Sequence, residues 1–378
     1  MKINYNYLHQ EFANPNEIIK EWKKLIKSTD FTLGKYVAEF ENSFSKFIGS
    51  KYCISTNNGT DALILCLKAL NVGPGDEVIT VVNTFYATVG AIEAVGATPV
   101  FCDCDERYQI DISDIKKKIT KNTKVIMPVH WGGASPDMYE IMKIAKVNNL
   151  KVIEDACMGI GGSLRGKSPG TFGDISAFSL HPLKSLNAMG DGGAVVTNNK
   201  KMYDWLLKYR NHGMINRNTI EIWGENKRMQ PLQCIVALWG LKKIKDVIKK
   251  RNINAKYYDM KLIELNRFIK VPTRTKGFTE TFALYMMVCK NRDKLKTFLE
   301  KKNIEVKIHY PKGLNQQPAF KKFNKKRNYG KFKISDNQAR TLLTIPVHQF
   351  INRKQQDYLI KNLKKFYRLN NISLVAGD

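Results

Sequence analysis

The sequence lacks the features that would place the protein in a membrane or direct it out of the cell. It contains no run of roughly 18 or more uncharged apolar residues, so we expect no transmembrane helix. The first residues, 1–7, have neither the apolar segment nor the cleavage site of a secretory signal. We therefore expect a cytoplasmic protein without a membrane partner.

Recognisable cysteine pairs are also missing. There are seven cysteines, an odd number, and most of them lie within apolar runs. The sequence Cys102-Asp103-Cys104 has neither the spacing nor the second pair of ligands that a metal site requires. These features favour free thiols in a reducing compartment, and we expect no metal.

Acidic residues are few in comparison with basic ones. The chain has 62 lysines and arginines against 34 acidic residues, a formal net charge of +28. Such an excess is compatible with nucleic acid, an anionic membrane or an acidic substrate. The lysines are scattered, however, with their densest stretch at 312–333, and no helix-turn-helix, zinc-finger or RNP signature occurs. We therefore predict a solvated basic surface and no specific nucleic-acid partner.

Hydrophobic periodicity predicts an α/β fold. From about residue 52, short apolar runs alternate with amphipathic segments, which is typical of a mostly parallel sheet covered on both faces. The predicted strands are 77–82, 98–102, 124–128, 151–154, 175–180 and 194–197, and the predicted helices are 84–95, 138–148, 201–209 and a long one at 232–256.

The length of 378 residues is enough for two domains. The pattern changes after residue 197, and the last part mixes short strands and helices. We predict a large domain over 1–249, including an N-terminal segment, and a smaller C-terminal α+β domain over 250–378. Residues 313–329 have little periodicity and are predicted to form a loop.

The first candidate catalytic residue is Lys184. An apolar strand ends at Ser179, a turn containing Pro182 follows, and a glycine-rich hairpin comes soon after. A lysine on such a turn can reach a carbonyl compound and form a Schiff base if burial or a nearby cation lowers its pKa. The alternative is an ordinary surface lysine.

Two other segments carry groups that suit the same chemistry. Asp155 closes an apolar strand, and ligands of open α/β sheets lie beyond the carboxyl ends of strands. A carboxylate there can pair with a pyridinium nitrogen. Gly59 and Thr60 open a helix, and a helix N-terminus of this kind is suited to a phosphate. A turn residue and an ordinary helix cap are the respective alternatives.

Together these segments resemble the DegT/DnrJ/EryC1/StrS family of sugar aminotransferases, which are fold-type I pyridoxal-phosphate (PLP) enzymes. The resemblance extends from about Gly34 to Phe350, nearly the whole chain. In order, the segments that carry it are Asn58-Gly59-Thr60-Asp61-Ala62-Leu63, Asn83-Thr84-Phe85, Glu154-Asp155-Ala156, Gly173-Asp174, the Lys184 turn, Gly190-Asp191-Gly192-Gly193-Ala194, Arg210-Asn211-His212-Gly213, Asn226-Lys227-Arg228-Met229 with Gln233, and His309-Tyr310-Pro311.

The resemblance implies how the cofactor is held. Lys184 would bind PLP covalently and later serve as the acid and base of the proton shift. Asp155 would bind the pyridine nitrogen, and Phe85 would stack on the ring. Three residues would hold the phosphate: Gly59, Thr60 and Ser179.

The resemblance also implies a homodimer with shared active sites, because Asn226 would reach the phosphate of the neighbouring chain. His181, Arg228 and His309 are implied substrate contacts, although a structural role is an equal alternative for the two histidines. One position departs from the family, which often has Glu-Asp-x-Ala-Gln here. Met158 occupies the cofactor-binding position of that glutamine and cannot donate an ordinary hydrogen bond.

The implied function is transfer of an amino group from glutamate or glutamine to a nucleotide-linked keto-sugar, in amino-sugar or surface-polysaccharide biosynthesis. Members that act at C3 more often carry Gly-Asp-Gly-Gly after the lysine turn, as residues 190–193 do here, so a 3-keto-6-deoxy sugar is the preferred acceptor. The alternatives are a C4-aminating enzyme, a cyclitol aminotransferase and a non-catalytic basic regulatory or nucleic-acid-binding protein. The dehydratase branch of the family replaces the lysine by histidine, which Lys184 argues against.

Overall fold

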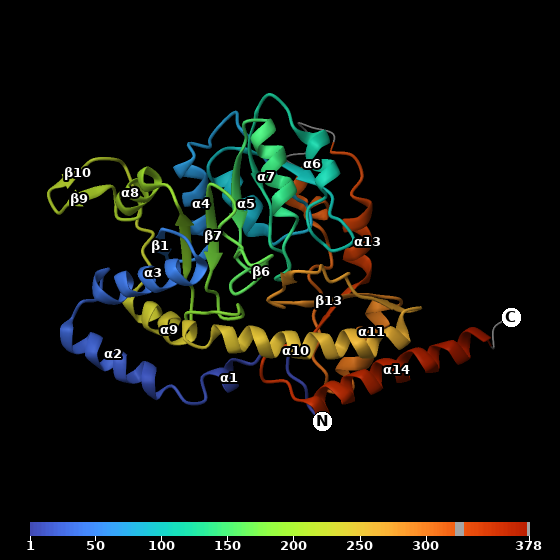
Figure 1. Ribbon diagram of the computed structural model, residues 1–378. Helices are drawn as coiled ribbons and strands as arrows, with labels where there is room; N and C mark the ends of the chain where they lie inside the picture. The colour runs from blue at the N-terminus through green and yellow to red at the C-terminus, as the bar shows by residue number, and fades with distance from the viewer. Residues whose placement is uncertain (322–328, 376–378) are drawn as a thin grey trace.

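The computed structural model describes residues 1–321 and 329–375 (Figure 1). A seven-stranded sheet forms its centre, in the order β1-β8-β7-β5-β4-β2-β3. Its neighbouring strands are parallel, except that β8 is antiparallel to both β1 and β7. In sheet order the strands are β1 Tyr52–Thr56, β8 Gly193–Thr197, β7 Ile175–Ser179, β5 Lys151–Asp155, β4 Thr123–Met127, β2 Glu77–Val81 and β3 Thr98–Cys102. The six strands predicted from the sequence differ from these by no more than one residue at either end.

Helices cover both faces of the sheet, as Figure 1 shows. Successive strand side chains point to opposite faces, so Val195 packs in the core on one side and Val196 in the core on the other. The first face is covered by α4 Gly59–Ala69, α5 Tyr86–Ala94 and α8 Lys200–Tyr209. The opposite face is covered by α2 Asn16–Ser28, α3 Gly34–Ile48, α6 Ile112–Lys118, α7 Met138–Val147 and α9 Pro231–Leu241.

A smaller unit follows with its own three-stranded antiparallel sheet and core. Its strands are β11 Ile269–Lys270, β13 Tyr285–Cys289 and β14 Leu342–Ile345, and its helices are α10 Ile244–Leu262, α11 Arg292–Glu300, α13 Lys333–Thr341 and α14 Arg353–Val375. Ile3 is buried in this core, and its backbone bonds to Asn303 and Glu305 at 2.9 Å each. The start of the chain thus packs with the C-terminal unit, and the division at residue 249 stays a prediction.

Several short elements complete the fold. They are α1 Leu8–Glu11, the 3-10 helices η1 Ile263–Leu265, η2 Leu314–Gln316 and η3 Pro318–Phe320, the ribbon of β6 Ser163–Leu164 with β12 Phe278–Thr279, and the hairpin of β9 Met214–Asn216 and β10 Thr219–Ile220. The hairpin projects from the side of the body in Figure 1. Within residues 1–321 and 329–375, no helix is long and apolar enough to cross a membrane.

Two expectations about segments need correction. The prediction of a single helix over 232–256 is wrong, because α9 ends at Leu241 and a second helix, α10, begins at Ile244. The break redirects the chain, since α9 packs in the core around α3 whereas the later residues of α10, such as Tyr258, pack in the core of the smaller unit. The loop predicted over 313–329 contains η2 and η3, and residues 322–328 of this lysine-rich stretch lie outside the described residues.

Candidate active site

A cavity of ≈ 560 Å³ lies where the large sheet meets the smaller unit. Residues that follow the carboxyl ends of β1, β2, β4, β5 and β7 line it, as expected for a ligand site of an open α/β sheet. Tyr5, Ala283, Leu284, His309 and Tyr310 close it from the N-terminal segment and the smaller unit. The predicted residues that line this cavity are Gly59, Thr60, Phe85, Asp155, Met158, Ser179, His181, Lys184 and His309.

Asp155 supplies a buried carboxylate to the cavity. It is the last residue of β5 and is 4% exposed. The Thr88 hydroxyl donates to its Oδ2 at 2.8 Å, and the backbone N–H of Cys157 donates to its Oδ1 at 3.3 Å. These two bonds fix the orientation of the carboxylate. Thr88 was not among the predicted site residues, although it lies about one helical turn after the Asn83-Thr84-Phe85 segment, which was singled out.

Lys184 reaches the same cavity from the turn that follows β7. The turn is closed by backbone bonds from Lys184 N–H to the His181 carbonyl at 2.8 Å and from Ala188 N–H to the Leu180 carbonyl at 2.9 Å. The side chain is half-buried, and burial lowers the pKa of its amine although the charges of Cys157 and Asp155 act in the opposite direction. The neutral amine is the form that attacks a carbonyl group, and a lowered pKa increases the fraction of lysine in this form.

The start of α4 forms a concave cradle. Asn58 caps this helix, because its side-chain oxygen accepts from the Asp61 N–H at 2.8 Å. Gly59 is the first helical residue, and a Cβ there would lie only 2.7 Å from Cβ of Ser179. Only glycine therefore allows the helix to start this close to the end of β7. The first N–H groups of a helix have no partner within it, so the cradle is suited to an anion.

The remaining predicted residues of the cavity differ in their surroundings. Burial, together with the charges of Lys184 and Lys307, lowers the pKa of His309 to about 4, and its Nδ1 lies 3.0 Å from the Thr344 hydroxyl. His181 is exposed, and its pKa is lowered by partial burial and by Lys184. Both histidines are therefore neutral at pH 7.

Phe85 and Met158 contribute apolar surface to the cavity. Phe85 is 38% exposed, and its ring centroid lies 3.9 Å from that of Tyr86. Met158 is half-buried, and its backbone carbonyl accepts from the Thr281 hydroxyl at 2.7 Å. The backbone at the position that departs from the family pattern is thus fixed by the smaller unit.

Asn226 and Arg228 lie outside the residues that line the cavity. Arg228 donates from Nε to Asn226 Oδ1 at 3.0 Å and from Nη1 to Asn211 Oδ1 at 2.8 Å. Asn226 is exposed, while Lys227 between them forms an ion pair with Asp61 near the α4 cradle. Their roles in a neighbouring chain's site, and the homodimer itself, stay predictions.

Glu154 lies directly behind the site and is fully buried. It accepts from the backbone N–H groups of Gly170, Phe172 and Gly173 at 2.6–2.8 Å, and it lies 3.0 Å from His130 Nε2. Burial alone would raise the pKa of this carboxyl, but the hydrogen bonds from His130 and the backbone lower it overall. The charged carboxylate therefore anchors the segment that leads into β7.

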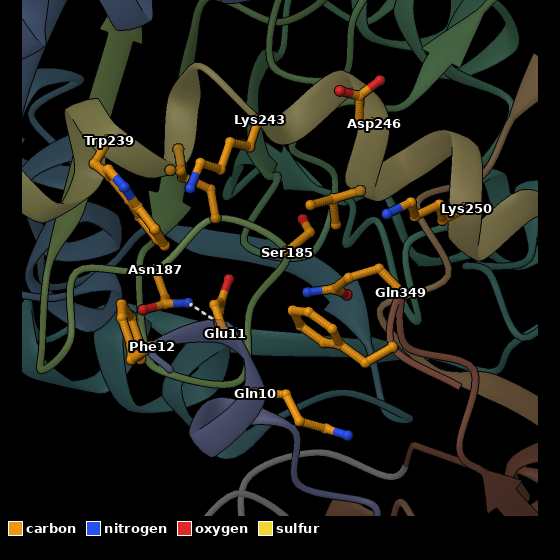
Figure 2. Close-up of a pocket in the computed structure, with 14 residues that line it drawn as sticks. Gln10, Glu11, Phe12, Ser185, Asn187, Trp239, Lys243, Asp246, Lys250 and Gln349 are labelled. Carbon is orange, nitrogen blue, oxygen red and sulfur yellow. Dashed lines mark hydrogen bonds between the residues drawn. The ribbon is translucent and has the colours of Figure 1, made fainter. Parts of the chain in front are cut away.

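A second cavity of ≈ 260 Å³ lies beside the segment that directly follows Lys184 (Figure 2). Ser185 and Asn187 line it, opposite α1 and the junction of α9 and α10. Figure 2 shows Glu11 accepting a hydrogen bond from Asn187, at 2.9 Å. Lys184 and Asp155 do not line this cavity, so we assign the active site to the larger one.

Known proteins are similar to this chain over nearly its whole length. The family model of the DegT/DnrJ/EryC1/StrS aminotransferases matches residues 13–364. A protein of Geobacillus stearothermophilus named pleiotropic regulatory protein is 33% identical over 354 residues, 93% of this chain and 95% of the relative. A dTDP-3-amino-3,6-dideoxy-alpha-D-galactopyranose transaminase of Aneurinibacillus thermoaerophilus is 36% identical over 351 residues, 93% and 95% of the two chains.

Solved structures extend the comparison to the fold. The crystal structure of NtdA from Bacillus subtilis with bound cofactor PMP is 28% identical, with a TM-score of 0.89 over 96% of this chain and 85% of that chain. This likeness, together with the family match, confirms the predicted fold class of fold-type I aminotransferases.

Proposed function

Because this chain belongs to the DegT/DnrJ/EryC1/StrS aminotransferase family, we propose that it moves an amino group from glutamate or glutamine to a nucleotide-linked 3-keto-6-deoxy sugar. The chain is a sugar aminotransferase of a PLP-dependent family, as the sequence resemblance implied. The non-catalytic regulatory alternative is set aside, because the family match covers residues 13–364 and includes all residues that line the cavity around Lys184 except Tyr5. The amino sugar would serve amino-sugar or surface-polysaccharide biosynthesis.

One observation carries this proposal: a lysine of lowered pKa, a buried carboxylate and a helix N-terminus meet in one cavity. These groups fit the three polar parts of PLP, namely its aldehyde, its pyridine nitrogen and its phosphate. The fit rests on the fixed carboxylate of Asp155 and on the cradle that a Cβ at Gly59 would fill. Gly59, Thr60 and Ser179 would hold the phosphate, and Phe85 would cover one face of the ring.

PLP supplies an electrophilic carbon and an electron sink when it is bound. Lys184 would hold PLP at that carbon, and its Nζ, once free, would accept the proton that the substrate loses and return it as the acid of the 1,3-proton shift. Asp155 would accept a hydrogen bond from the ring nitrogen and keep it protonated. His181 and His309, both neutral at pH 7, would offer hydrogen bonds to the sugar rather than charge. Met158 would contribute contact surface only, since its thioether lacks a donor.

The preference for a 3-keto sugar has two supports. The Gly190-Asp191-Gly192-Gly193 hairpin is the form more often found in C3-aminating members, and Asp191 lines the cavity, where it can affect the orientation of the sugar. One of the most similar relatives is named for a 3-amino sugar linked to dTDP. Amination at C4 and amination of a free cyclitol ketone are the competing possibilities.

Two experiments test the proposal in sequence. Borohydride reduction of the purified, yellow protein should fix the cofactor on Lys184, as read by peptide mass spectrometry. Lys184→Ala should abolish turnover, whereas Lys124→Ala, which removes a lysine paired with Asp76 at the protein surface, should leave it unchanged. An adduct on a different lysine would refute the assignment of Lys184.

The second experiment addresses the substrate. The enzyme is incubated with glutamate or glutamine and each member of a panel of 3-keto and 4-keto sugar nucleotides. NMR of the products then locates the new amine. Amination at C4 alone would overturn the choice of C3 and leave the aminotransferase assignment intact.

A further inference from the structure

The backbone of Lys184 is held by a residue far away in the sequence. Its carbonyl accepts a hydrogen bond from the Tyr7 hydroxyl at 3.1 Å. Tyr7 lies just before α1 and is 5% exposed. Burial raises the pKa of Tyr7, so its hydroxyl keeps its proton at neutral pH. The N-terminal segment therefore contacts the backbone of the Lys184 turn.

Tyr7 is itself held by Arg251 of α10. The guanidinium Nη2 donates to the Tyr7 oxygen at 2.8 Å, and its carbon atom lies 5.3 Å from the centre of the Tyr7 ring. Arginine can only donate hydrogen bonds, so Arg251 occupies the acceptor side of the hydroxyl. The Tyr7 proton is then directed to the other partner within reach, which is the Lys184 carbonyl.

Arg251 is poorly explained by stability alone. It is 1% exposed, and within residues 1–321 and 329–375 its guanidinium donates to neutral oxygens only: Tyr7 Oη, the Phe282 carbonyl at 3.4 Å and Gln349 Oε1 at 3.1 Å. The charge of Glu11 interacts with that of Arg251, but no carboxylate among the described residues forms a direct ion pair with this guanidinium. Burial of a charge without a direct ion pair is costly, and an apolar side chain would avoid that cost. The charge does, however, polarise the Tyr7 hydroxyl and strengthen its bond to Lys184.

We propose that Tyr7 and Arg251 are positioning residues, which fix the Lys184 backbone and thereby keep the lysine amine half-buried in its reactive form. This inference rests on the proposed role of Lys184. It assigns a function to the N-terminal segment and to α10, which otherwise contribute no reacting group. Without the Tyr7 bond, the turn would relax towards the cavity, water would reach the amine, and its pKa would return towards that of an exposed lysine.

The test compares Tyr7→Phe with a matched control, Tyr258→Phe. Tyr258 is a fully buried residue of α10, and its hydroxyl also donates to a backbone carbonyl, that of Pro346, at 3.0 Å. Each variant loses a buried hydroxyl that donates to a backbone carbonyl, and Tyr7→Phe also loses the bond that this hydroxyl accepts from Arg251. Only Tyr7 contacts the lysine turn. The full chain is freed of cofactor, and the rate at which a lysine acylating reagent labels Lys184 is followed by mass spectrometry from pH 7 to 10.

We expect Tyr7→Phe to label Lys184 about fivefold more slowly at pH 8, the effect of one net hydrogen bond on an equilibrium. Tyr258→Phe should label at the wild-type rate. In the PLP-loaded protein, the pH midpoint of the visible absorbance should shift in Tyr7→Phe alone. Arg251→Lys keeps the charge but not the planar set of donors, so its rate should lie between those of wild type and Tyr7→Phe.

Labelling of Lys184 at the wild-type rate in both Tyr7→Phe and Arg251→Lys would overturn the proposal. Equal slowing in Tyr7→Phe and Tyr258→Phe would also overturn it, because the effect would then be one of general stability. A failure of the proposed function looks different: wild-type Lys184 would show the expected reactivity without binding PLP.

Discussion

Gly59→Ala is the substitution whose effect on the active site follows most directly from the structure. The added Cβ would lie 2.7 Å from Cβ and 3.2 Å from Cα of Ser179, whereas carbon atoms pack at about 3.5–4.0 Å. Since the clash involves backbone-bound atoms, the start of α4 or the end of β7 must move by up to about 1 Å. Overpacking of this kind costs about 1–3 kcal/mol.

That cost falls on the cradle proposed to hold the cofactor phosphate. If this free-energy cost falls on the PLP-bound state, the Kd for PLP should rise by a factor of about 5–150, since about 1.4 kcal/mol corresponds to each factor of ten. The assay is a titration of the cofactor-free protein with PLP, followed by absorbance and repeated with inorganic phosphate as competitor. The loss of binding free energy for PLP should exceed any loss in the free energy of unfolding, because alanine is a better helix former than glycine.

Gly90→Ala serves as the control for this titration. Gly90 is exposed within α5, and no atom lies within 4 Å of the Cβ it would gain. Gly90→Ala should bind PLP as wild type does, and its free energy of unfolding should be higher by about 0.5–1 kcal/mol. A Gly59→Ala protein that binds PLP within twofold of wild type would refute the placement of the phosphate.

Three further predictions concern charge and assembly. Lys227→Met removes the ion pair of Asp61 beside the cradle and should weaken PLP binding about fivefold. The double variant Lys227→Met with Asp61→Asn should restore the wild-type affinity. An unchanged Kd in Lys227→Met would exclude this coupling. The lowered pKa of Glu154 means that its charged form stabilises the fold above pH 4.5 and that this stability is lost as the pH falls. Glu154→Gln should therefore cost about 3–5 kcal/mol at pH 7 but progressively less below pH 4.5 in chemical denaturation, and a pH-independent difference would contradict the linkage. Sedimentation at micromolar concentration should show a homodimer, and Asn226→Ala should lower its PLP affinity; a fully active monomer would disprove the shared site.

The sequence was sufficient to predict the parts of the site that lie on local patterns. Asp155 and Lys184 each follow an apolar run that proves to be a strand, and Gly59 follows a capping asparagine. Because parallel strands present their carboxyl ends at the same edge of a sheet, three local patterns were enough to bring these residues together. The order of the strands was not needed.

The residues that sequence patterns did not reveal come from distant segments. Tyr5 and Trp131 line the cavity, but neither belongs to a pattern that points to a ligand. Tyr5 reaches the site because Ile3 is anchored in the core of the smaller unit, a contact with no counterpart in local periodicity. The break after Leu241 was missed for a similar reason, since apolar residues continue through it at helical spacing while the core that they face changes.

The same separation explains why the support of Lys184 and its chemistry come from different parts of the chain. β5 and β7 place the carboxylate and the lysine turn, and both are predictable as short strands from their apolar residues. The bond that fixes the turn comes from Tyr7, and the charge that directs it comes from Arg251 on α10. Sequence patterns do not distinguish Tyr7 and Arg251 from other tyrosines and arginines. Their role is indicated by their contact in the folded protein, where both are buried. Reactivity of Lys184 should accordingly depend on residues 177 and 67 positions away from it in the sequence as much as on its own neighbours.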